Sequence, residues 1–245
     1  MIAVLLVACG QPPGLDGKVV DIWGEPIEGA TVRLAGHDEQ PLTDREGRFR
    51  LPPFQGSREI KVGRMGFVQD RTEWVGDGRP GRGPVFELYP QPKDFGFYLV
   101  NSGAYGRLPP TPVDAIAGPL HTIAGLTSVG NVVADSRTMR VLMHTPLSVD
   151  EVARLDLELH RIEFIDRTEM LGPLGHVSAT VQRWTAWQEV PTTLRPLRSR
   201  TDYLITTNGP LEPGHYALQT QGLLTSGGAL TLPKELRVAF PFEVR

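Results

Sequence analysis

The chain has 245 residues, a formal net charge of −3 and 40% hydrophobic residues. That length suggests one large domain or two ordinary ones. The charge gives no electrostatic basis for nucleic-acid binding, which usually requires a strong basic footprint, and the hydrophobic content is too low for a bundle of membrane helices. The 27 glycines and 22 prolines favour many short strands joined by turns over a helical protein.

The N-terminal segment is apolar and ends at the only cysteine. Residues 2–8 read Ile-Ala-Val-Leu-Leu-Val-Ala and are followed by Cys9 and Gly10. This stretch resembles a bacterial lipobox, which implies that Cys9 is acylated and becomes the first residue of the mature protein. Residues 1–13 are therefore predicted to be a lipoprotein signal and tether; the alternative for so short an apolar run is a buried N-terminal strand. No Lys or Arg precedes the run, so we expect the true start codon to lie upstream.

A lipid on Cys9 has consequences for the rest of the chain. No other cysteine is present, so no disulfide can staple the fold in an oxidising compartment. No later run approaches the roughly 18 apolar residues of a membrane span. We therefore expect an exported protein that is held on a bacterial membrane by its lipid. In the lipoproteins that it resembles, a residue other than Asp after the cysteine favours the outer membrane, and Gly10 fits that pattern.

Residues 14–92 contain alternating strand patterns separated by turn signals. In residues 30–34 apolar and polar side chains alternate, as in a half-buried strand. Asp44 can begin a turn by bonding its own backbone, and Gly47 can supply a positive φ. The glycine- and proline-rich segment 76–84 is predicted to be a long flexible loop.

Several short motifs follow one another along these residues. They are Gly17-x-Val19, Gly24-x-Pro26, Gly29-Ala30-x-Val32, Thr43-Asp44-x-x-Gly47-x-Phe49 and Gly66-Phe67. In this order the motifs resemble the carboxypeptidase regulatory-like domain. The resemblance implies a seven-stranded β-sandwich of the transthyretin (prealbumin-like) type over residues 14–92. It also implies a non-catalytic role in folding, spacing or binding.

Residues 93–245 are predicted to form a second β-rich domain, because turn signals recur at short intervals. Leu211-x-Pro213-Gly214 before a tyrosine-bearing strand resembles the last hairpins of bacterial immunoglobulin-like domains, which implies that fold. Residues 107–119 are predicted to be a proline-rich loop with a short helical turn at 113–117, and Ser148-x-x-Glu151 has the form of a capping box for a helix of about one turn. Strands are expected at 95–100, 129–134 paired with 139–143, 155–164, 177–188, 201–206, 215–220 and 236–244.

Three tryptophans are candidate ligand-binding residues, because an aromatic ring offers a stacking surface to a sugar. Trp23 occupies a turn, where it either receives a ligand or packs on the neighbouring loop. Trp184 and Trp187 are three residues apart in an expected strand, so at most one of them should be exposed. A proline-containing loop carries a basic cluster that is either solvated or meets anionic lipid head groups: Arg195, Arg198 and Arg200.

The most enzyme-like motif is His160-Arg-Ile-Glu163, which resembles the His-x-x-Glu ligand pair of zinc carboxypeptidases. The motif lies in a strand-like sequence, too little chain follows it for that catalytic fold, and a zinc site needs at least three converging ligands. Asp156, Glu158 and His160 are expected to share one strand face, as a solvent face or as a polar row for a cation. After His160 the alternation changes phase, which predicts a bulge or a change of exposure.

These patterns predict no catalytic residue, no metal site and no cofactor. The first hypothesis is a non-enzymatic, lipid-anchored protein of the cell envelope whose β domains bind or make structural contacts. Its expected partners are membrane lipid, through acylated Cys9, and an envelope protein or polysaccharide, but not nucleic acid. The second hypothesis is a carbohydrate-binding module. The third is a metal-dependent hydrolase that uses Asp156, Glu158 and His160.

Overall fold

The structure, a computed structural model, describes residues 14–117, 122–171, 177–220, 222–225 and 228–245. These residues lie mostly in strands, so the prediction of an all-β chain is confirmed. The chain divides into two compact units with a boundary between Gln91 and Pro92. Among the residues that the structure describes, no helix has both the length and the hydropathy needed to cross a membrane. Cys9 and the rest of the predicted signal and tether lie outside the described residues.

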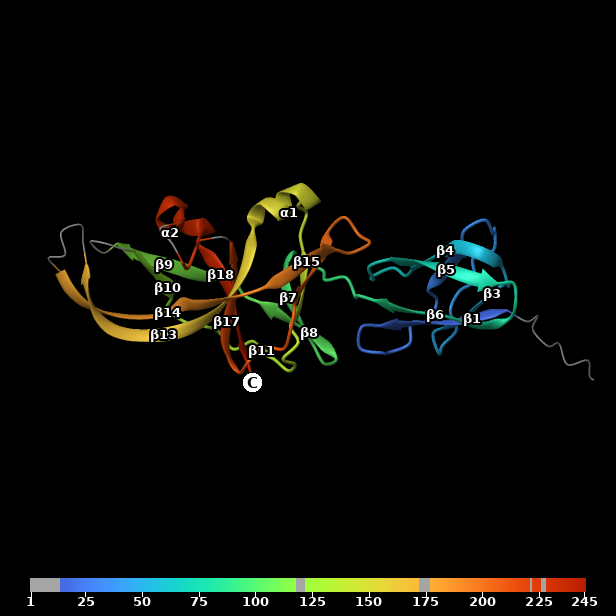
Figure 1. Ribbon diagram of the computed structural model, residues 1–245, viewed down its shortest axis with the longest axis horizontal. Coiled ribbons are helices and arrows are strands. Elements are labelled where there is room, and N and C mark those ends of the chain that lie inside the picture. Colours follow the sequence, from blue (N-terminus) through green and yellow to red (C-terminus); the bar gives the residue numbers. More distant parts are fainter. Residues whose placement is uncertain (1–13, 118–121, 172–176, 221, 226–227) are drawn as a thin grey trace, which may run out of the picture. The chain divides into compact units, whose positions relative to one another are not determined.

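The N-terminal unit is a sandwich of two three-stranded sheets (Figure 1). Its strands are β1 (Leu15–Asp21), β2 (Thr31–Leu34), β3 (Arg48–Leu51), β4 (Gln55–Gly63), β5 (Asp70–Asp77) and β6 (Gly81–Leu88). One sheet has the order β3-β1-β6, in which β1 is antiparallel to β3 and parallel to β6. The other sheet has the order β2-β4-β5 and is antiparallel. One core lies between them, formed mainly by Val19, Val32, Leu34, Ile60 and Leu88.

Residues 14–91 form six strands where seven were expected. The residues before β3 form only an isolated bridge, between Leu42 and Thr31. The N–H of Thr43 donates to the carbonyl of Ala30 at 2.9 Å. Pro41 has no N–H to continue the pairing on the other side, so the segment stays too short to count as a strand.

The turn before β3 forms as predicted. The Asp44 carboxylate accepts the N–H of Glu46 at 3.0 Å and of Arg48 at 2.7 Å. Gly47 has a φ of 73°, a conformation that a residue with a Cβ rarely adopts.

The prediction of a long flexible loop at 76–84 is wrong. β5 extends to Asp77 and β6 begins at Gly81, so a short turn joins them. A Cβ on Gly76 would lie 2.2 Å from the carbonyl oxygen of Phe54. That glycine therefore permits a close approach within the strand, a role that composition alone does not distinguish from flexibility.

The C-terminal unit contains two larger sheets. Its strands are β7 (Gly96–Asn101), β8 (Ala104–Leu108), β9 (Thr111–Ala117), β10 (Thr122–Leu126), β11 (Val133–Ala134), β12 (Arg140–His144), β13 (Leu157–Leu171), β14 (Val177–Val190), β15 (Thr192–Pro196), β16 (Asp202–Thr207), β17 (Gly214–Thr220) and β18 (Val238–Val244). The helices are α1 (Val149–Leu155), α2 (Gly228–Thr231) and a 3₁₀ turn at Lys234–Leu236. One sheet has the order β15-β16-β12-β7-β8, and the other β11-β18-β17-β13-β14-β10-β9.

An additional pairing between β18 and β9 closes six strands of this sheet into a ring, and β11 lies outside the ring. This arrangement goes beyond the expected immunoglobulin-like domain, which has seven to nine strands in two open sheets. One detail of that fold is present: the Tyr216 hydroxyl donates to the carbonyl of Glu212 at 2.8 Å, as in a tyrosine corner. Tyr98 makes the same contact with the carbonyl of Asp94 at 2.7 Å.

β13 contributes to two separate cores of this unit. Leu159 is buried in the first core, which packs against the five-stranded sheet, and Ile162 is buried in the second, within the closed sheet. Between them the register with β14 shifts, and Trp187 is the extra residue on β14. The predicted change of phase after His160 is therefore confirmed, and its cause is that the strand passes from one core to the other.

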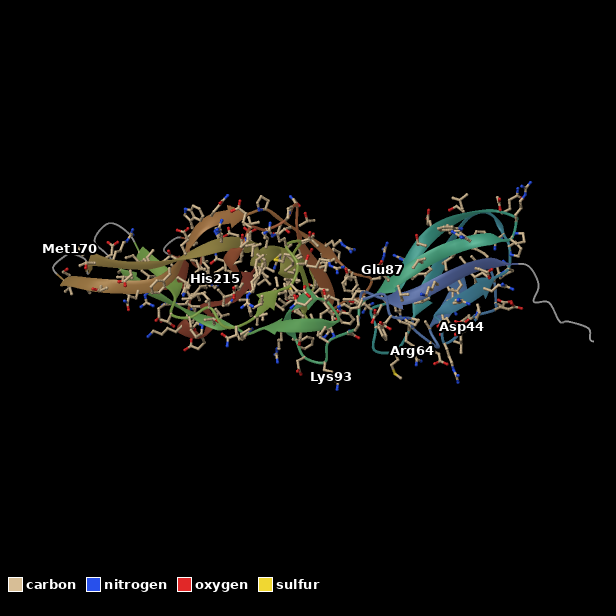
Figure 2. All side chains as sticks on the ribbon, turned by 90° about the horizontal axis from the view of Figure 1, so that it is seen from below. Asp44, Arg64, Glu87, Lys93, Met170 and His215 are labelled. Atoms are coloured by element: carbon tan, nitrogen blue, oxygen red, sulfur yellow. The ribbon has the colours of Figure 1, made fainter. Side chains whose placement is uncertain are left out.

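The paired β13 and β14 form a long curved hairpin that extends beyond the first core (Figure 1). Met170, which is 51% exposed, lies toward the far end of this hairpin (Figure 2).

Two local predictions in this unit are wrong. Residues 111–117 form β9 and not a helical turn, because Thr111 and Val113 alternate inward with exposed neighbours. The segments 129–134 and 139–143 do not pair with each other. β11 pairs with β18, and β12 lies between β7 and β16. Both Val141 and Leu142 are buried, as in a central strand with partners on each side.

The predicted capping box forms and begins a longer helix than the single turn expected. The N–H of Ser148 donates to Glu151 Oε2 at 2.8 Å, and the N–H of Glu151 donates to Ser148 Oγ at 3.4 Å. The N–H and the hydroxyl of Ser148 both donate to Glu151 Oε2, at 2.8 and 2.7 Å, and hold the pKa of Glu151 below its usual value. The helix runs over seven residues.

The last strand, β18, lies beside three others. One edge pairs with β17, while the other pairs first with β9 at Val238–Ala239 and then with β11 at Glu243–Val244. The N–H of Glu243 points to this second edge, so by alternation the nitrogen of Pro241 does too. Pro241 falls between the two pairings, where no donor is needed.

Candidate functional site

The clearest candidate site is a pocket in the N-terminal unit. Its volume is about 340 Å³, at the lower end of the range of about 300–1,000 Å³ for small-molecule sites. The pocket lies where β1 and the turn from β5 to β6 meet the residues before β4. Its apolar lining includes Leu15, Phe54 and Trp74, and charged residues of its lining are Asp77, Arg79 and Arg82.

The strand pattern of β5 places Trp74 in the pocket. Alternate residues of β5 are partly buried, and Trp74 is one of them. Two residues further on, Gly76 has no side chain, and a Cβ there would lie within 2.9 Å of the Phe54 ring. The glycine therefore lets Phe54 approach β5, which brings the two aromatic rings to the same pocket.

Phe54 is held firmly beneath the pocket. Its side chain is only 6% exposed, and the Arg58 guanidinium lies 5.8 Å from the centre of its ring. Its carbonyl accepts the N–H of Gly78 at 2.9 Å, which fixes the turn between β5 and β6 to this residue. A preformed aromatic surface of this kind can receive the apolar face of a ligand.

A fixed ion pair lies on the neighbouring strands. The Arg50 guanidinium of β3 binds both carboxylate oxygens of Asp16 of β1, at 2.6 and 3.1 Å. This hydrogen-bonded pairing holds the pKa of Asp16 below its usual value. Arg50 is thus already engaged by a carboxylate of the protein.

The three tryptophans predicted from the sequence are not brought together. Trp23 lies in the turn after β1, as expected, and its backbone N–H donates to the Asp21 carboxylate at 2.9 Å. It is half-buried and does not line the pocket. Trp184 packs against the second core, with ring centroids 4.4 Å from His215 and 5.5 Å from Phe164. These contacts leave Trp184 a packing role.

Trp187 is the exposed member of the pair in β14, at 58% exposure, so the expectation that at most one is exposed is confirmed. The Arg161 guanidinium lies 5.2 Å from the centre of its ring. Arg161 is itself held by Glu212, at 2.8 Å, and by the carbonyl of Pro213, at 3.2 Å. Trp187 therefore offers a flat surface on the hairpin and does not line the pocket of the N-terminal unit.

The polar row predicted on one strand is only partly present. Glu158 and His160 do share a face of β13, with 3.0 Å between Glu158 Oε2 and His160 Nε2, and Gln219 lies 3.4 Å from the same oxygen. Asp156 precedes the strand as the C-cap of α1, with a left-handed backbone, so its predicted place in the row is wrong. Glu163 is exposed, whereas His160 is buried. Within the described part of the chain, no group of three or more potential ligands could hold a metal.

A buried polar pair was missed by the sequence analysis. His144 Nδ1 and Asp202 Oδ1 are 2.8 Å apart, at neighbouring ends of β12 and β16. Asp202 Oδ2 also accepts the hydroxyls of Ser199, at 2.5 Å, and of Thr201, at 3.0 Å. Because Ser199 bonds the carboxylate and not the imidazole, the group lacks the order of a nucleophile and its base. The Asp202 hydrogen bonds instead hold the loop that carries Arg198 and Arg200 of the predicted basic cluster. All three arginines of that cluster, which also includes Arg195, are exposed.

The comparisons with known proteins include a weak structural likeness. No family model matches the chain, and no curated protein does. A solved structure from Bacteroides uniformis, described as a "putative carbohydrate binding protein", is 12% identical, with a TM-score of 0.25 over 87% of this chain and 92% of that chain.

Proposed function

We propose that this chain is a non-enzymatic, lipid-anchored protein of the cell envelope, and that its N-terminal unit binds a saccharide. The pocket of Trp74 and Phe54 is the observation that carries the proposal. A sugar ring presents C–H groups on its faces and hydroxyl groups around its edge. The aromatic floor would contact a face, and the polar groups of the rim would bond the edge.

Two further features support binding as the function of this pocket. Its floor is rigid, because Phe54 is buried and its carbonyl holds the adjoining turn. Its rim carries polar groups that can orient a ligand, including the guanidinium groups of Arg79 and Arg82. Pre-organised sites lose less entropy when a ligand binds.

The test of saccharide binding is the comparison of three tryptophan variants. In gels that contain soluble polysaccharides and on arrays of oligosaccharides, Trp74→Ala should weaken binding by about tenfold or more, because the stacking surface is lost. Trp23→Ala and Trp187→Ala should bind as the unchanged protein does. Circular dichroism melting curves would show that each variant is folded. Loss of binding in Trp187→Ala alone would place the site on the hairpin and contradict our proposal for the pocket.

The anchoring part of the proposal has a separate test. The gene, expressed with its upstream region in bacteria fed labelled palmitate, should yield a labelled protein in the membrane fraction. The Cys9→Ser variant should be unlabelled and leave that fraction. If the variant still carries label and stays with the membrane, Cys9 is not the anchor.

A further inference from the structure

The rim of the pocket carries two arginines, Arg79 and Arg82. Arg79 lies in the turn between β5 and β6, and Arg82 is the second residue of β6. Both are exposed and both line the pocket. Among the residues that the structure describes, neither guanidinium makes an ion pair, in contrast to Arg50, which is held by Asp16. Two positive charges at the rim are therefore available to a ligand.

The one carboxylate of the pocket lining is committed to the turn. Asp77 Oδ1 accepts the N–H of Arg79 at 2.9 Å, so this group stabilises the backbone from which Arg79 projects. The rim as a whole carries two arginines against one carboxylate. Its charge therefore favours an anionic ligand.

The backbone that carries the arginines is held at both ends. The N–H of Gly78 donates to the carbonyl of Phe54 at 2.9 Å, and the N–H of Gly81 donates to the carbonyl of Gly14 at 3.1 Å. Between them, Pro80 restricts the chain. The backbone from which the two arginine side chains project is thus constrained before any ligand binds.

We infer that the pocket selects an acidic saccharide, in which a sugar ring lies against Trp74 and its carboxylate binds Arg79 or Arg82. A guanidinium binds a carboxylate through two parallel N–H donors, and this charge-assisted pairing is about twice as strong as a neutral hydrogen bond. This inference rests on the proposed saccharide function and adds the charge of the ligand. Trp74 is half-buried in the pocket lining. That position suits a ring that receives a small ligand better than one that inserts into a bilayer.

The test compares a charged and a neutral form of the same oligosaccharide. Titration calorimetry of the purified full chain would use oligomers of galacturonic acid and the same oligomers with methyl-esterified, neutral carboxyl groups. The acidic oligomer should bind about tenfold or more tightly, and the preference should shrink as salt is added. The double variant Arg79→Gln/Arg82→Gln should lose that preference and bind both oligomers as weakly as the unchanged chain binds the neutral one.

A matched variant controls for net charge. Lys61→Gln/Arg71→Gln also removes two positive charges from the N-terminal unit, from side chains that pair with Glu59 on β4 and do not line the pocket. This variant should keep the preference for the acidic oligomer.

The possible outcomes separate the inference from the function on which it rests. Equal binding of the two oligomers would overturn the inference and leave saccharide binding standing. Binding of neither oligomer would overturn the inference, and if the oligosaccharide array is also blank, saccharide binding fails with it. Binding to phosphatidylglycerol vesicles that is lost in the Arg79→Gln/Arg82→Gln variant, without binding of either oligomer, would assign the two arginines to a lipid surface and overturn the inference.

Discussion

The two units use their strands in different ways. In the N-terminal unit each sheet presents one face to a single core, so alternate residues stay buried along a whole strand, as in β3. In the C-terminal unit β13, β17 and β18 contribute to two cores, and the buried residues of β13 change parity at Ile162. β13 passes from the first core to the second along its length, and the extra residue Trp187 in β14 accommodates this change. The candidate pocket belongs to the simpler unit.

The largest expected effect tests whether the two units are stable independently of each other. Phe242 is fully buried and stacks on Tyr216 in the C-terminal unit, so Phe242→Ala should lower the free energy of unfolding of that unit by about 3–5 kcal/mol. Phe86→Ala should act in the same way on the N-terminal unit, where Phe86 is buried. Hydrogen exchange with mass spectrometry would show which unit opens. If either variant opens both units together, the two units do not unfold independently.

The next effect compares the stability cost of an alanine at two turn glycines of the N-terminal unit. Gly47→Ala would combine a positive φ with a Cβ 2.3 Å from the carbonyl of Val19, so we expect a loss of stability of about 1–3 kcal/mol or more. Gly24 also has a positive φ, but no atom lies within 4 Å of a Cβ there. Gly24→Ala should therefore cost less than Gly47→Ala. Urea unfolding curves of the two variants would decide, and equal losses would show that the close contact does not matter.

A smaller effect concerns the tyrosine corner of the C-terminal unit. Tyr216→Phe removes the hydroxyl that bonds Glu212, which should cost about 0.5–1.5 kcal/mol in thermal or urea unfolding. Burial raises the pKa of Tyr216, so this hydroxyl should remain protonated above the pH at which an exposed tyrosine ionises. Spectrophotometric titration of the unchanged chain and the variant should differ by one late-ionising tyrosine. A difference at the ordinary pKa would contradict the buried hydrogen bond.

The smallest effect concerns the cap of α1 and depends on pH. Because hydrogen bonds from Ser148 lower the pKa of Glu151, the charged form stabilises the fold fully above the ordinary pKa of 4.5. That contribution is lost as the pH falls through the lower pKa of the folded state. Glu151→Gln should remove this part of the pH dependence, so the difference in stability between the variant and the unchanged chain should narrow as the pH falls below 4.5. Stability curves at several pH values would show it, and a difference that widens on acidification would have the wrong sign.

The local features of the fold were the most predictable from the sequence. Alternation along residues 30–34 and the turn chemistry of Asp44 and Gly47 depend on near neighbours, and both appear as expected. The partners of β12 were not predictable, because its neighbours β7 and β16 are far from it in the chain. Prolines in residues 107–119 suggested a loop, but the alternation of Thr111 and Val113 prevailed.

The pocket was harder to foresee than the tryptophans themselves. Trp74 lies in an ordinary strand pattern, and only the approach of Phe54 over Gly76 makes its position a pocket. Trp23 and Trp184 were also candidate ligand-binding residues from the sequence. In the structure Trp23 lies in a turn, and Trp184 packs against a core. A stronger signal would have been Trp74 two residues before a glycine, followed by arginines that flank a proline.

The position of β18 has a consequence for how the C-terminal unit folds during synthesis. This strand joins β17, β9 and β11 and supplies Phe242 to the first core and Ala239 to the second. Among the described strands of this unit, it is also the last to leave the ribosome. The partner strands can gather earlier, but neither core can be completed until residues 238–244 have emerged. The nascent unit would meanwhile display unpaired strand edges, so we expect it to rely on chaperones more than the N-terminal unit does.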